Sequence, residues 1–137
     1  MKKTISFVLI LFPVSTMAIP LGNYIMVDRK GDGFVRFCKA ETTEELENIN
    51  LTKENIYLSL PEKTNYMILK KIQKNNGSIL EVENQFKVKY KYLISKTNDD
   101  GVYQWEAYSG KKKIDDLSFF AVKKSFIGKI KDSGECQ

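Results

Sequence analysis

The segment DRKGDG at 28–33 has the residue types of a calcium-binding loop. Asp28 and Asp32 match positions 1 and 5 of an EF-hand loop, which needs oxygen ligands at positions 1, 3 and 5 and a glutamate at position 12. Positions 3 and 12 are Lys30 and Lys39, which place cations where ligands are required. The spacing therefore argues against calcium, and we predict no metal site here.

The same segment fits the tip of a β-hairpin. Short apolar runs at 23–27 and 34–38 flank it, and such runs are typical of strands rather than of the helices that flank an EF-hand loop. Gly31 and Gly33 suit the positive φ angles that tight hairpin turns require. We predict a hairpin with both glycines at positive φ.

Few residues are suited to catalysis. The chain contains no histidine, which removes Ser–His and Cys–His nucleophile pairs and most zinc sites. Glu81 and Glu83 share one strand face and resemble the carboxylate pair of a glycosidase, but the same alternation places them on the solvated side of an amphipathic strand. We predict a protein without catalytic residues or cofactors; a carboxylate-based hydrolase is the enzymatic alternative.

The N-terminus has the three parts of a secretory signal peptide. Lys2 and Lys3 precede an apolar run at 5–14, and Thr16 and Ala18 stand at −3 and −1 of a cut after Ala18. The run is shorter than the about 20 apolar residues that span a bilayer. We predict a signal peptide at 1–18 and one β-rich domain at 19–137, exported to the periplasm or the extracellular space of a bacterium and not membrane-spanning.

Cys38 and Cys136 are the only cysteines. In an oxidising compartment an even pair predicts one disulfide. The bridge would close almost the whole exported chain, which the chain-entropy model values at about 4–5 kcal/mol.

The strongest periodic pattern covers residues 78–95. Even positions 80–94 are apolar or aromatic except for Asn84, and the odd positions between them are polar except for Leu93. Because side chains alternate between the two faces of a strand, we predict that the even positions face the core. The pattern indicates one long bent strand or two strands joined without a register change.

The rest of the chain predicts further strands separated by turns. Expected strands lie at 23–27, 34–38, 55–60, 102–108, 117–122 and 125–130. Residues 64–74 favour a strand over a helix because the hairpin signal NNGS follows, 41–49 begins like a helix, and 116–124 is a possible helix. The predicted fold is mainly β, with α+β as the alternative: a curved antiparallel meander or small barrel with one or two short helices.

Lysines form the clearest candidate for a binding surface. Lys87, Lys89 and Lys91 share one strand face, and three more occupy a predicted turn at 111–113, namely Lys111, Lys112 and Lys113. The ordinary interpretation is a solvated surface. The functional one is a partner-binding patch for an acidic protein, phosphorylated lipid headgroups or cell-wall polymer. Nucleic acid is not expected, because the chain is predicted to be exported and has two arginines.

Four aromatic residues have two interpretations. Tyr90, Tyr92, Tyr103 and Trp105 are expected core residues, but in an open barrel they would line a pocket. We therefore predict a small exported, non-enzymatic binding protein with an acidic protein partner, such as an inhibitor or immunity protein acting on another envelope protein. The alternative is a carrier of a small apolar ligand in a β-barrel or curved-sheet pocket.

Overall fold

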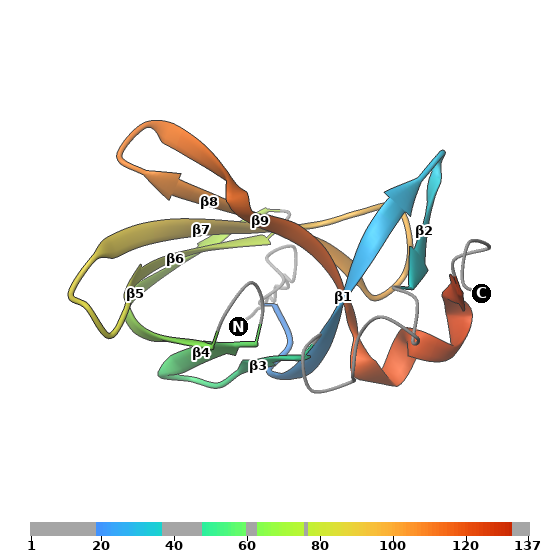
Figure 1. Ribbon diagram of the computed structural model, residues 1–137, viewed down its shortest axis with the longest axis horizontal. Helices are drawn as coiled ribbons and strands as arrows, with labels where there is room; N and C mark the ends of the chain where they lie inside the picture. The colour runs from blue at the N-terminus through green and yellow to red at the C-terminus, as the bar shows by residue number, and fades with distance from the viewer. Residues whose placement is uncertain (1–18, 37–47, 60–62, 76, 133–137) are drawn as a thin grey trace, which may run out of the picture.

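A closed antiparallel β-barrel forms the body of the protein (Figure 1). The computed structural model describes residues 19–36, 48–59, 63–75 and 77–132. Within these ranges the strands are β1 (Gly22–Lys30), β2 (Gly33–Arg36), β3 (Asn48–Leu51), β4 (Asn55–Leu58), β5 (Thr64–Lys74), β6 (Gly77–Glu83), β7 (Lys89–Lys96), β8 (Val102–Ser109), β9 (Lys112–Lys123) and β10 (Lys131–Asp132). The predicted mainly-β fold is confirmed, in its barrel form.

Strand β1 closes the barrel by pairing on both edges. The sheet order is β10-β2-β1-β3-β4-β5-β6-β7-β8-β9, and β1 pairs with β9 as well. The β1–β9 seam joins Tyr24 to Lys123 at one end and Val27 to Phe120 at the other. Eight strands, β1 and β3–β9, thus form the closed wall, while β2 and β10 extend beyond it.

The barrel interior is filled by one face of each strand. Tyr103, Trp105 and Ala107 alternate with more exposed residues along β8 and are buried, as predicted. Strand β1 is different, because residues 24–27 are all buried. Its outer face packs in a second apolar cluster with the short 3₁₀ helix η1 (Lys124–Lys129), which explains the continuous apolar run IMV at 25–27.

The pattern at 78–95 belongs to two strands that pair with each other. Strands β6 and β7 are antiparallel, with Val82 opposite Tyr90 and Glu83 opposite Lys89. Because even residues oppose even residues, the alternation passes through the turn without slipping. The prediction that every even position faces the core is wrong at the turn, where Phe86 is 73% exposed and Val88 is 42% exposed.

Several other predictions are settled by the observed elements. Residues 64–74 form β5, as favoured. The helix considered at 116–124 is wrong, because β9 continues to Lys123. The strand expected at 125–130 is also wrong, because most of that segment lies in η1. Of the helix expected at 41–49, residues 48 and 49 lie in β3 and the others are outside the described residues.

The DRKGDG segment is the tip of the β1–β2 hairpin. Lys30 pairs with Gly33, and Gly31 has a φ of 59°. Gly33 does not have a positive φ, because it already belongs to β2; that part of the prediction is wrong. Residues 1–18, Cys38 and Cys136 lie outside the described residues, so signal cleavage and the disulfide stay predictions.

Candidate functional site: the outer face of β5–β8

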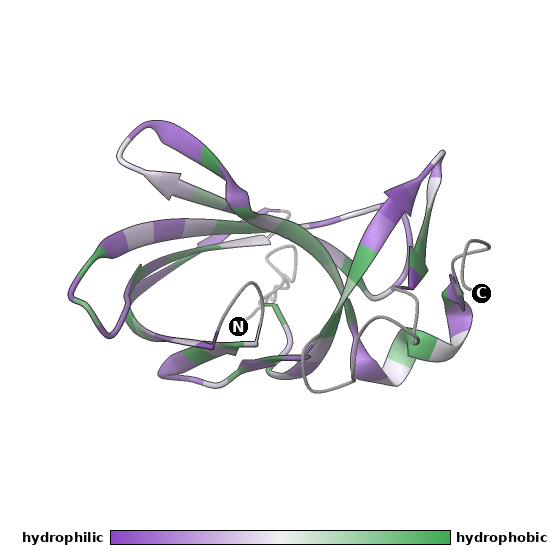
Figure 2. Cartoon of the chain, viewed as in Figure 1, coloured by the Kyte–Doolittle hydropathy of each residue, from purple (hydrophilic) through white to green (hydrophobic). Residues whose placement is uncertain are grey.

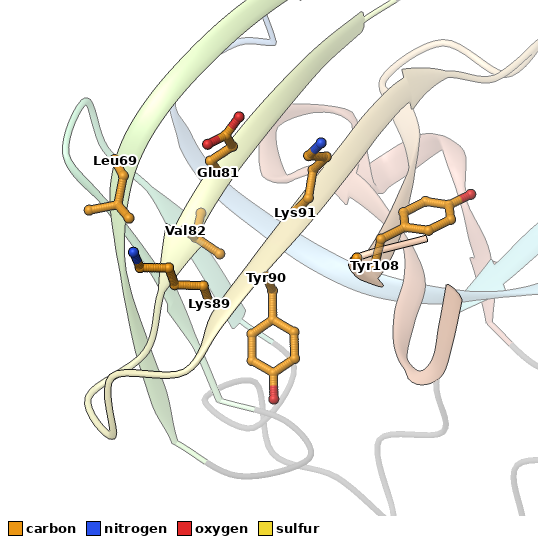
Figure 3. A pocket seen from close by; sticks show the side chains of 8 residues that line it. Leu69, Glu81, Val82, Lys89, Tyr90, Lys91 and Tyr108 are labelled. Carbon is orange, nitrogen blue, oxygen red and sulfur yellow. The ribbon is translucent and has the colours of Figure 1, made fainter. Parts of the chain in front are cut away.

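The predicted lysine face lies on the outside of the barrel, over β5–β8. In the strand register Lys91 stands between Glu81 of β6 and Tyr108 of β8, and Lys89 stands opposite Glu83. Figure 3 shows Glu81 and Lys91 projecting to the same side of neighbouring strands, while the ring of Tyr90 points the opposite way. The face is therefore mixed in charge, with a carboxylate opposite each of the two lysines.

Apolar side chains lie beside these charges. The β5–β6 register shifts between Ile68 and Lys70, so the bulged Leu69 has no partner on β6. Leu69 is 47% exposed. A shallow hollow of about 260 Å³ contains Leu69 and Tyr108 together with the charged residues (Figure 3). We name Leu69, Glu81, Lys89, Lys91 and Tyr108 the docking face.

The other predicted lysines occupy two hairpin tips. Lys87 has a φ of 69° in the β6–β7 turn and is exposed. Lys111 and Lys112 are exposed at the β8–β9 tip, where Gly110 has a φ of 64°. Lys113 differs from these, because its Nζ lies 3.2 Å from Glu106 and that hydrogen bond raises the pKa of the ammonium. The structure thus separates the six lysines into wall and tip positions.

The candidate pocket aromatics belong to the interior cluster of the barrel, in one network of ring contacts that Tyr24 and Tyr66 complete. Tyr92 and Trp105 are fully buried, and their ring centroids are 5.9 Å apart in an edge-to-face arrangement. Tyr66 bridges Tyr90 and Tyr92 in the same way, with centroids 6.0 and 5.6 Å away. Edge-to-face pairs at these separations are favourable, so the rings stabilise the core.

Of two polar groups in this aromatic core, one has a hydrogen-bond partner and the other has none among the described residues. The Tyr92 hydroxyl donates to the carbonyl of Leu117 at 3.1 Å. Burial holds the pKa of Tyr92 well above its ordinary value, since ionisation would place a phenolate in the apolar interior. The indole N–H of Trp105 is buried and has no acceptor among the described residues.

The described segments contain neither a metal-ligand cluster nor a membrane-spanning helix. Within those segments no group of three or more Asp, Glu, His or Cys residues could hold a metal ion. No helix there is long and apolar enough to cross a membrane.

Sequence reasoning found Lys89 and Lys91 but missed Leu69 and Tyr108. The alternation KVKYKY at 87–92 marks the lysines directly, whereas the exposure of Leu69 follows from a bulge with no signal in the sequence. Tyr108 falls on the polar side of the VYQWEAY alternation, which was the available clue.

Comparisons with known proteins add no assignment. A scan against protein-family models found no match, and searches of curated proteins and of solved structures found no significant similarity.

Proposed function

We propose that this chain is a small exported, non-enzymatic binding protein that acts on another envelope protein, as an inhibitor or immunity protein does. The observation that carries the proposal is the docking face. It joins an exposed leucine, a tyrosine and charges of both signs on four neighbouring strands, β5–β8. Aromatic and aliphatic anchors within a polar rim are typical of protein–protein contact surfaces.

The mixed charge favours a protein with an acidic patch beside an apolar one. Lys89 and Lys91 would meet acidic side chains, and Leu69 and Tyr108 would pack on the apolar part of the partner. Charges at the rim of such an interface mainly set the association rate and the choice of partner. Glu81 would meet a donor, which discriminates against uniformly acidic surfaces.

Affinity capture from envelope extract tests this proposal. We expect Tyr108→Ser and Lys89→Asp to weaken capture of the partner, and the loss caused by Lys89→Asp should shrink at high salt as screening removes its charge contribution. Lys74→Glu is the matched control, because this exposed cation lies at the other end of β5. Equal capture by all four proteins would contradict the proposal.

Carriage of a small apolar ligand is the second candidate function. The closed barrel and the unpartnered indole N–H of Trp105 favour it, because a ligand acceptor would satisfy that donor. The interior rings contact each other, so a ligand would have to displace them. Organic extraction of the purified protein followed by mass spectrometry tests this function, and a stoichiometric apolar compound would support it.

A further inference from the structure

Two hairpin tips project from the same end of the barrel. The β6–β7 turn at 84–88 and the β8–β9 turn at 110–111 point toward the same side of the molecule (Figure 1). The strand register explains why the two turns are neighbours. Lys91 of β7 pairs with Tyr108 of β8. Two residues nearer the tips, Lys89 and Gly110 line the same hollow. We name residues 84–88 and 110–112 the hairpin end.

The hairpin end carries an apolar projection. Phe86 is 73% exposed, the highest value among the exposed large apolar residues of the described chain, and Val88 is 42% exposed. Figure 2 shows hydrophobic colour at this tip between hydrophilic segments. Exposing a phenylalanine in water forgoes the free energy of burying its ring, and contact with an apolar environment outside the chain would recover that free energy.

Hydrogen bonds between side-chain oxygens and backbone amides fix the backbone of this turn. The side-chain oxygen of Asn84 accepts hydrogen bonds from the amides of Phe86 at 2.8 Å and Val88 at 3.0 Å. The side-chain oxygen of Gln85 accepts a bond from the amide of Asn65 at 3.3 Å, which ties the turn to β5. A turn fixed in advance loses little conformational entropy on binding.

Three lysines occupy the two tips of the hairpin end. Lys87, Lys111 and Lys112 are exposed, and none of them forms an ion pair with another described residue. Of the carboxylates near the two tips, Glu83 stands opposite Lys89 and Glu106 binds Lys113. Asp115 and Asp116 line one hollow with Lys112. The hairpin end therefore carries three lysines without an ion pair to a described residue, and one of them, Lys87, is next to Phe86 in the chain.

We propose that the hairpin end docks the protein on a membrane surface rich in anionic lipid headgroups. Phe86 and Val88 would enter the boundary between headgroups and acyl chains, and Lys87, Lys111 and Lys112 would contact phosphate groups. Apolar insertion and basic attraction together give the two signals that stable peripheral binding requires. This surface goes beyond the proposed function, because it lies at the barrel end and not on the docking face.

Vesicle flotation with the full chain tests the inference. The vesicles are phosphatidylcholine alone, or phosphatidylcholine with about one third phosphatidylglycerol. We expect preference for the anionic vesicles, a roughly fivefold loss of partitioning in Lys111→Gln and a roughly tenfold loss in Phe86→Ser. Residues 1–18 are present in every protein compared, so the differences report on the hairpin end.

Matched controls distinguish binding through the hairpin end from non-specific membrane binding. Tyr57→Ser removes a 44% exposed aromatic residue from the barrel wall, and Lys74→Gln removes a cation from the opposite end of the barrel. Both should bind vesicles like the wild type. Equal binding to neutral and anionic vesicles, or equal losses in control and tip variants, would overturn the inference.

A third outcome would indicate that the hairpin end binds a protein partner and not a membrane. If vesicle binding is absent but Phe86→Ser abolishes capture of the envelope partner, the membrane inference fails and the proposed function stands. If vesicle binding behaves as expected while docking-face variants leave capture unchanged, the membrane inference stands and the proposed function fails.

Discussion

Asn84 holds Val88 with both its backbone and its side chain. The Asn84 amide donates to the Val88 carbonyl at 2.9 Å, and the Asn84 side-chain oxygen accepts from the Val88 amide at 3.0 Å. These two bonds fold the chain back at the point where the sequence pattern continues unbroken. Val88 is thereby placed outside the core despite its even position.

The first prediction compares two valines of the same hairpin. Val82→Asp should cost several kcal/mol of unfolding free energy, because Val82 is fully buried and the new carboxylate would have no partner. Val88→Asp should cost less than about 1 kcal/mol, because Val88 is exposed. Urea unfolding measures both, and equal destabilisation would show that the turn is placed wrongly.

The second prediction concerns the side chain of Asn84. Asn84→Ala removes the acceptor for two backbone amides and should destabilise the protein by about 1–2 kcal/mol. Hydrogen exchange of the Phe86 and Val88 amides should become faster in the same variant. Asn84→Asp keeps an acceptor oxygen and serves as the control, so fast exchange in Asn84→Asp as well would argue against this role.

The third prediction is a loss of stability at alkaline pH. Burial raises the pKa values of Tyr24, Tyr66, Tyr92 and Tyr103 in the folded protein. Unfolded tyrosine ionises at about pH 10, so above that pH the unfolded state loses protons that the folded state keeps. The stability conferred by these phenols is complete below about pH 10 and is lost as the pH rises further.

Circular dichroism and tyrosinate absorbance, followed together, measure that loss. The buried phenols should ionise in the same transition in which β-structure disappears. Tyr92→Phe removes one titrating group, so its unfolding free energy should fall less steeply with pH. Ionisation of all tyrosines well before unfolding would refute the explanation.

The fourth prediction concerns cleavage of the signal peptide and the disulfide bridge. We expect cleavage after Ala18 and a Cys38–Cys136 bridge, which the intact mass of protein isolated from the envelope would show as loss of residues 1–18 and of two hydrogens. Cys38→Ser should lower the unfolding free energy, by up to about 4–5 kcal/mol in the chain-entropy model. Two free thiols in the isolated protein, or a retained Lys2, would contradict this prediction.

Local patterns predicted most of the long strands and two of the hairpins, but not the closure of the barrel. The alternation at 102–108 identified the buried faces of Tyr103, Trp105 and Ala107, because one barrel face meets the core and the other meets solvent. The turn at 84–88 lacks glycine and proline and keeps parity, so its only local mark was Asn84, the one polar residue among the even positions. The carboxylates opposite Lys89 and Lys91 were also missed as neighbours, because the register between β6 and β7 follows from that turn.

The β1–β9 seam also affects how fast the protein is expected to fold. Tyr24 and Lys123 are register partners from opposite ends of the described chain. Contacts so distant in sequence bear a large loop-closure entropy before they gain any energy, which slows folding. We therefore expect the β1–β9 pairing, which closes the barrel, to form late in folding.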